Sequence, residues 1–153
     1  MRQVWFAMML AGAIASPAGV EGFAHWPSSE LQTYGARLAP RMNPQKLALE
    51  ILADYGNHSV MVAHREGSGE AELHEEFNDI SVVQSGSGTL VVGGTIVNGR
   101  TTAPGEIRGP SIQGGEKRKL GPGDIVHVPP RTPHQVLLDP GQKLTYVVIK
   151  IRR

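Results

Sequence analysis

Glycine and proline interrupt this sequence so often that they leave little room for long helices. The 153 residues include 19 Gly and 11 Pro, and short apolar runs stand between them. Short runs bounded by turn-forming residues are typical of β-strands. A chain of this length also suits a single domain. The pattern therefore predicts one turn-rich, all-β domain.

Eight strand candidates follow one another from residue 46 onward. Two of them flank Asp54-Tyr55-Gly56-Asn57, which is a good turn sequence. The other six are 71–76, 80–84, 89–92, 125–128, 135–138 and 144–151. Short strands separated by Gly and Pro favour an antiparallel sandwich or barrel. The polar, Gly-rich segment 93–122 is then either a functional flap or an excursion of the sheet.

The first 24 residues have the layout of a secretory signal peptide. Arg2 supplies a basic start, residues 4–15 are apolar but too few to span a bilayer comfortably, and cleavage is possible after Ala18 or Ala24. The alternative is an apolar helix packed on the domain. We expect residues 1–24 to be a signal peptide, the protein to be secreted or periplasmic, and no stable membrane span to remain after cleavage.

A helical segment is expected between this leader and the strands. Leu31, Tyr34 and Leu38 share one face of a helix at the spacing i, i+3, i+7. We therefore expect residues 25–45 to form a short N-terminal helix or connection, and residues 46–153 to form the barrel domain.

Composition excludes several classes of function. The formal net charge of +1 gives no electrostatic argument for nucleic acid, and the basic cluster 117–119 is too short to supply one. The chain has no Cys, which excludes thiolate catalysis and zinc–thiolate sites. We expect a small-molecule ligand and no nucleic-acid partner.

The candidate chemistry lies in an acidic stretch with one histidine and in a second, distant histidine. If the segment ELHEE is extended, then Glu72, His74 and Glu76 point to one face, and Asp79 follows at the next turn. His134 follows a proline-rich connection that restricts its direction. A solvated acidic edge strand is the alternative interpretation.

The sequence around His134 resembles the second motif of the cupin superfamily. Gly123, Pro129 and His134 match the glycine, proline and histidine of that motif in order and spacing, and Arg131 replaces its turn glycine. This match is good and, with the first motif, extends the resemblance over residues 48–151.

The stretch around His74 resembles the first cupin motif in part. His74 and Gly86 match the second histidine and the glycine, whereas Glu72 takes the place of the first histidine and Asp79 that of the glutamate. The pair of motifs is more specific for a fold than for a function.

The resemblance implies a small antiparallel jelly-roll barrel, which in metal-binding members holds one divalent transition metal. Carried over residue by residue, the ligands are Glu72, His74, Asp79 and His134. Such a set suits Fe(II), Mn(II), Ni(II) or Zn(II). If the strand register differs by a step, Glu76 is a reserve ligand, and it is also the candidate catalytic base. Small cupins commonly pair as homodimers, so a homodimer is implied as well.

Three functions remain open on this sequence. The first is metal-assisted oxygenation, decarboxylation or isomerisation of a small polar molecule. The second is metal-free binding of a carbohydrate- or carboxylate-like ligand. The third is a structural barrel filled with apolar side chains.

Segment 93–122 is expected to border the barrel mouth, where Arg100, Arg108 or Lys117 either meet an anionic ligand or stay solvated. His64 is expected to be a hydrogen-bonded core histidine.

Overall fold

The computed structural model describes residues 19–153, so most of the expected signal peptide lies outside the described residues. Helices α1 (Ser28–Leu31) and α2 (Tyr34–Leu38) and a 3-10 turn (Ala39–Arg41) precede the first strand, which begins at Leu47. From residue 19 onward, no helix is long and apolar enough to cross a membrane.

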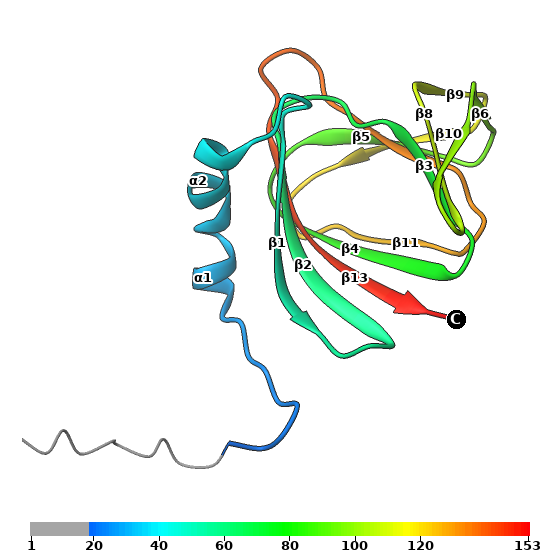
Figure 1. Cartoon of the computed structure of the whole chain (residues 1–153). Coiled ribbons are helices and arrows are strands. Elements are labelled where there is room, and N and C mark those ends of the chain that lie inside the picture. The colour runs from blue at the N-terminus through cyan, green and yellow to red at the C-terminus, as the bar shows by residue number, and fades with distance from the viewer. Residues whose placement is uncertain (1–18) are drawn as a thin grey trace, which may run out of the picture.

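Two antiparallel sheets face each other and curl into a barrel (Figure 1). The five-stranded sheet has the order β1 (Leu47–Asp54), β2 (His58–Arg65), β13 (Leu144–Arg152), β4 (Phe77–Gly86), β11 (Ile125–Val128). The six-stranded sheet has the order β10 (Glu116–Leu120), β5 (Gly88–Val92), β12 (His134–Leu137), β3 (Ala71–His74), β8 (Glu106–Gly109), β7 (Arg100–Ala103). A small ribbon pairs β6 (Thr95–Val97) with β9 (Ser111–Gln113).

The architecture confirms the predicted all-β antiparallel barrel with short helical structure at its N-terminal side. Segment 93–122 is not an irregular flap. It contains the strands β6 to β10 and so forms an excursion of the sheet. One predicted strand was too long. The strand expected over 71–76 ends at His74, and residues 75–76 form a bend before β4.

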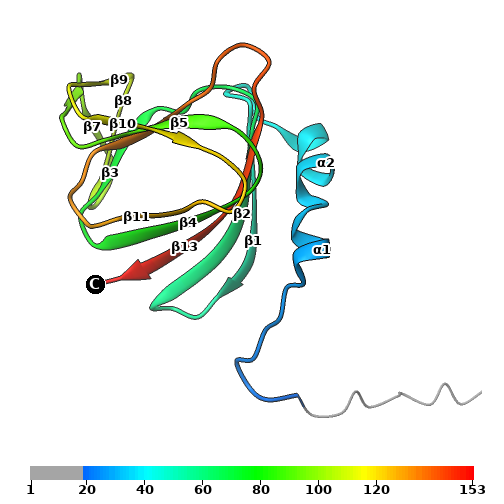
Figure 2. The ribbon, with the colours of Figure 1, turned by 180° about the vertical axis from the view of Figure 1, so that it is seen from behind.

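Two hydrophobic clusters lie on opposite faces of the five-stranded sheet. The inner cluster fills part of the barrel and consists of Ala63, Val83, Leu90, Leu120, Leu144, Tyr146 and Val148. The outer cluster packs α2 against the sheet and consists of Tyr34, Leu38, Ala48, Val60, Val62 and Val147. Figure 2 shows the helices on the outer side of β1 and β2. Because side chains alternate along a strand, β2 serves both clusters.

The two motif-bearing segments contain the backbone turns that the sequence demands. Gly86 has φ +82°, and a Cβ there would overlap the carbonyl oxygen of Lys143. Arg131, which replaces the turn glycine, also has a positive φ, of 63°. Its N–H donates to the carbonyl oxygen of His74 at 2.7 Å. This hydrogen bond ties the loop before β12 to the end of β3 and so joins the two motifs.

Candidate functional site

Four of the residues expected at the site come together inside the barrel. Glu72 and His74 lie two residues apart on β3, which places both on one face. Asp79 enters from β4, and His134 begins β12, where it stands opposite Glu72 in the strand register. The two imidazole rings have centroids 5.3 Å apart. Antiparallel pairing thus brings distant parts of the chain to one place.

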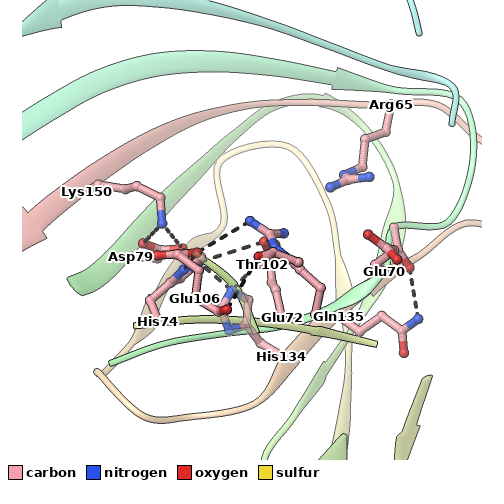
Figure 3. Close-up of polar contacts among 12 residues, drawn as sticks. Arg65, Glu70, Glu72, His74, Asp79, Thr102, Glu106, His134, Gln135 and Lys150 are labelled. Carbon is pink, nitrogen blue, oxygen red and sulfur yellow. Dashed lines mark hydrogen bonds and ion pairs between the residues drawn. The ribbon is translucent and has the colours of Figure 1, made fainter. Parts of the chain in front are cut away.

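The polar atoms of these four residues converge (Figure 3). Nε2 of His74 lies 3.3 Å from Oδ2 of Asp79 and 3.7 Å from Oε2 of Glu72. Nε2 of His134 lies 3.5 Å from the same Asp79 oxygen and 3.7 Å from Oε1 of Glu72. Glu72, His74 and His134 each offer one ligand atom within 4.8 Å of the others.

Hydrogen bonds at the far side of each ring decide which nitrogen faces the cavity. Nδ1 of His74 lies 2.6 Å from Oε2 of Glu106, and Nδ1 of His134 lies 3.0 Å from the carbonyl oxygen of Thr132. Both partners are acceptors, so we assign the hydrogen of each neutral ring to Nδ1. Each Nε2 is then left with a lone pair. Nε2 of His74 is buried and makes no hydrogen bond within residues 19–153.

Neighbouring charged and hydrogen-bonding groups shift the pKa values of Asp79 and His134. Burial alone would raise the pKa of Asp79, but His134, His74 and Lys150 hold it well below its usual range. Nζ of Lys150 lies 3.0 and 3.3 Å from the two carboxylate oxygens of Asp79. Burial would lower the pKa of His134, whereas Asp79 and the charge of Glu72 raise it above its usual value.

The excursion of the sheet supplies two further residues to the site. Arg108 on β8 forms an ion pair with Glu72, and Glu106 on the same strand orients His74. Sequence reasoning named Arg108 but missed Glu106. The signal that identifies Glu106 is its register opposite His74, which appears only once β3 and β8 are paired. Arg100 instead binds the exposed Glu70, and Lys117 is exposed on β10.

The structure does not bring Glu76 into this site, contrary to the expected spare ligand and base. Its side chain is 63% exposed and pairs with Arg152. The physical reason is the bend after His74, which ends the strand alternation that would have turned Glu76 inward.

His64 is a core histidine, as expected, but it lies outside the barrel cavity. Its Nδ1 lies 2.8 Å from Oγ1 of Thr145, and its Nε2 lies 3.3 Å from Oε1 of Glu66. Gly35 on α2 packs beside the ring and the Thr145 hydroxyl. The side chains of β2 on the same face as Val60 and Val62 therefore point towards the helices. Those on the other face of β2 point into the barrel.

The converging residues form the polar end of a cavity of about 170 Å³ inside the barrel. Apolar side chains of both sheets form most of its walls, and Arg65 and Tyr146 also line it. Neither of these two was singled out from the sequence. An open cavity with converging donors opposes the interpretation of a barrel filled by apolar side chains.

The donor set fits a divalent transition metal. Two imidazole nitrogens and one or two carboxylate oxygens are ligands that such ions accept. Ligand atoms about 2.0–2.2 Å from one ion stand about 3–3.5 Å apart, close to the 3.3–3.7 Å between the nitrogens and the carboxylate oxygens. Nε2 of His74 is buried and makes no hydrogen bond within residues 19–153, and its lone pair also suits a cation.

No family model matches this sequence. No curated protein matches it either. Its similarity to known proteins is therefore described from solved structures.

Several solved structures resemble this barrel at low sequence identity. The protein TT1209 from Thermus thermophilus is 20% identical, with a TM-score of 0.56, and the match covers 77% of this chain and 93% of that one. A cupin-2 domain from Rhodospirillum rubrum is 15% identical, with a TM-score of 0.53 and coverage of 71% and 63%. The Streptomyces nucleoside dehydratase Pac13 is 14% identical, with a TM-score of 0.52 and coverage of 72% and 73%. At these identities the matches establish the fold.

Proposed function

We propose that this chain, which has the cupin β-barrel fold, holds one divalent transition metal inside the barrel and uses it to activate a small polar substrate. The observation that carries the proposal is the pair of Nε2 atoms of His74 and His134. Both face the cavity beside carboxylates, both are fixed by hydrogen bonds at Nδ1, and that of His74 makes no hydrogen bond among the described residues.

Each residue of the cluster has a distinct part in this proposal. Glu72, His74 and His134 would hold the ion, and Asp79 would serve as a fourth ligand or as an acceptor beside it. Glu106 keeps the ring of His74 in orientation, as carboxylates do for metal-binding histidines. A bound metal would supply Lewis acidity, which polarises an oxygen of the substrate.

The apolar walls define what the rest of the cavity contributes. Met61, Val83 and Leu90 lie on the lining and would exclude water from the polar end. The reactions to be assayed are oxygenation, decarboxylation and isomerisation of a small oxygenated molecule. That a solved structure of this fold is a nucleoside dehydratase supports the choice of an enzyme over a structural barrel.

Metal-free binding of a small ligand is the second candidate, and one observation favours it. Lys150 already pairs with Asp79, Arg108 pairs with Glu72, and the raised pKa of His134 lets that ring carry a proton. The cluster is thus able to balance much of its own negative charge without an ion.

Metal content distinguishes the two candidates. We would purify the protein without a histidine tag, measure bound metals by elemental mass spectrometry, and repeat this after incubation with Fe(II), Mn(II), Ni(II) and Zn(II). Near-stoichiometric metal that is lost in His74→Ala and His134→Ala but kept in His127→Ala is the expected result. His127 is the matched control because it is exposed and lies outside the cavity. Failure of all four metals to bind contradicts the metal-dependent function.

Export and dimerisation belong to the proposal as well. The layout of residues 1–24 supports export, and the resemblance to small cupins supports a homodimer. N-terminal sequencing of protein from a bacterial periplasmic fraction tests the first, and light scattering of the mature chain tests the second. An uncleaved N-terminus in the cytoplasm contradicts export, and a monomeric mass contradicts the dimer.

A further inference from the structure

A second polar group lies in the cavity, apart from the cluster around His74. Arg65 is the last residue of β2 and takes the inward parity of that strand. It is 7% exposed, and its Nε donates to the hydroxyl of Tyr146 at 2.9 Å. Figure 3 shows Arg65 on its own, away from the residues joined by dashed lines around His74.

The guanidinium of Arg65 lacks an anionic partner in the described part of the chain. No carboxylate of residues 19–153 lies within ion-pair distance, and the terminal amino groups Nη1 and Nη2 make no hydrogen bond there. Arg108, the other arginine of the cavity, is paired with Glu72. Burial would lower the pKa of Arg65, but Tyr146 and the charge of Glu72 raise it, so the group stays a cation. A largely buried cation that has no anionic partner among these residues is costly, although its terminal amino groups are not fully enclosed.

The space around this guanidinium is built into the fold. A Cβ at Gly69 would stand 2.8–3.0 Å from three of the guanidinium atoms, so the missing side chain at Gly69 gives the guanidinium room in this position. The backbone of Gly69 is fixed in turn. Its N–H donates to Val136 at 2.8 Å, and its carbonyl oxygen accepts from Gln135 at 2.9 Å. Arg65 is therefore positioned by its hydrogen bond to Tyr146 and packs beside a fixed backbone segment.

The donors left over match one kind of ligand group. Nη1 and Nη2 form a planar fork suited to two parallel hydrogen bonds with a carboxylate. The Tyr146 oxygen accepts from Arg65, so its own hydrogen is free to donate to the same group. Apolar side chains of the inner cluster line the same cavity as this fork and the two histidines.

We propose that Arg65 and Tyr146 bind a carboxylate of the substrate, so that the ligand is a small carboxylic acid with an apolar body. Its other end then faces His74 and His134. The position of that reacting end rests on the proposed function, whereas the carboxylate end does not depend on a metal.

Calorimetric titration of the wild-type protein, both metal-free and zinc-loaded, tests this assignment. The probes are butanoate, hexanoate and benzoate, each compared with its neutral amide. At least one acid is expected to bind about tenfold or more tightly than its amide, in both forms of the protein. If no acid binds more tightly than its amide, the proposal is overturned. If phenyl phosphate binds through Arg65 more tightly than every acid, the carboxylate assignment is overturned in favour of phosphate.

Variants connect the preference to the two residues. Arg65→Met keeps an apolar stem and is expected to abolish the preference for acid over amide. Arg100→Met, which removes an exposed arginine, is expected to keep it. Tyr146→Phe keeps the charge of Arg65 and is expected to weaken acid binding several-fold, so it decides the matter if Arg65→Met does not fold. Preference retained in both Arg65→Met and Tyr146→Phe overturns the proposal.

The two proposals fail separately in these experiments. If the protein binds no metal but prefers acids to amides, the metal-dependent function is contradicted and the carboxylate site is supported. Stoichiometric metal without acid preference does the reverse.

Discussion

Glu106 touches Nδ1 of His74 and thereby determines which nitrogen of that ring faces the cavity. We predict that Glu106→Ala lowers the affinity for zinc about 10- to 100-fold, because the ring loses the acceptor that fixes its orientation. Competition with a chromophoric chelator measures this affinity. Glu116→Ala removes an exposed glutamate of β10 and is expected to leave the affinity unchanged. Equal affinities in both variants would argue against an orienting role.

Gly86 is the residue whose replacement should harm the fold most directly. Its positive φ and the overlap of a Cβ with the Lys143 carbonyl both oppose a side chain. We predict that Gly86→Ala lowers the free energy of unfolding by about 3 kcal/mol or more. Gly56→Ala, at φ +84° in open space, is expected to lower it by about 1–2 kcal/mol. Urea denaturation compares them, and equal losses would refute the role of the overlap.

The residues of the site differ in how well their positions could be predicted from the sequence. His134 and His74 stand in recognisable motifs, and strand alternation places Glu72 on the same face as His74. Arg65 carries no such signal, because its partner Tyr146 lies on the distant strand β13. Whether its side chain points into the barrel also depends on which face of β2 the helices cover. Glu76 shows the opposite failure, since alternation was extended past the end of β3.

Among the elements, the strands of segment 93–122 are those that the sequence hides. All four residues of β7 are exposed, and β8 and β9 carry no buried apolar stripe. Hydrophobic alternation therefore gives no indication of them. What forms β8 is pairing with β3, a tertiary contact. The apolar strands β4, β5 and β13, by contrast, were predicted because burial and periodicity agree in them.

Helix α2 gives a prediction at this scale. Leu38 is fully buried in the outer cluster, away from the cavity. We predict that Leu38→Ala lowers the free energy of unfolding by about 2–5 kcal/mol without changing zinc or acid affinity. Ile51→Ala, at a position 66% exposed on β1, is expected to change stability by less than about 0.5 kcal/mol. A loss of ligand affinity in folded Leu38→Ala would show that the two clusters are coupled.

For the whole molecule, metal binding should appear as stability. A ligand that binds only the folded state at 100 times its dissociation constant raises the free energy of unfolding by about 2.7 kcal/mol. We predict a gain of this size with zinc, detected by thermal denaturation, and no gain in His134→Ala. A similar gain in that variant would place the ion elsewhere.

The same binding should depend on pH. Below the raised pKa of His134, Nε2 of that ring holds a proton that a metal ion must displace. Zinc affinity is therefore expected to rise with pH up to that pKa and then to level off, with about one proton released per ion below it. Calorimetry in two buffers of different ionisation enthalpy measures the release. An affinity independent of pH would show that His134 does not bind the ion.

The two hydrophobic clusters have a consequence for how such a protein changes over evolutionary time. The inner cluster is both the wall of the ligand cavity and part of what stabilises the barrel, so any substitution that reshapes the cavity for a new ligand also disturbs packing. The buried residues of the outer cluster, under α2, do not line the cavity, so substitutions there can improve stability without reshaping it. Stabilising substitutions there would give the barrel tolerance for destabilising changes within, and so let its specificity diverge.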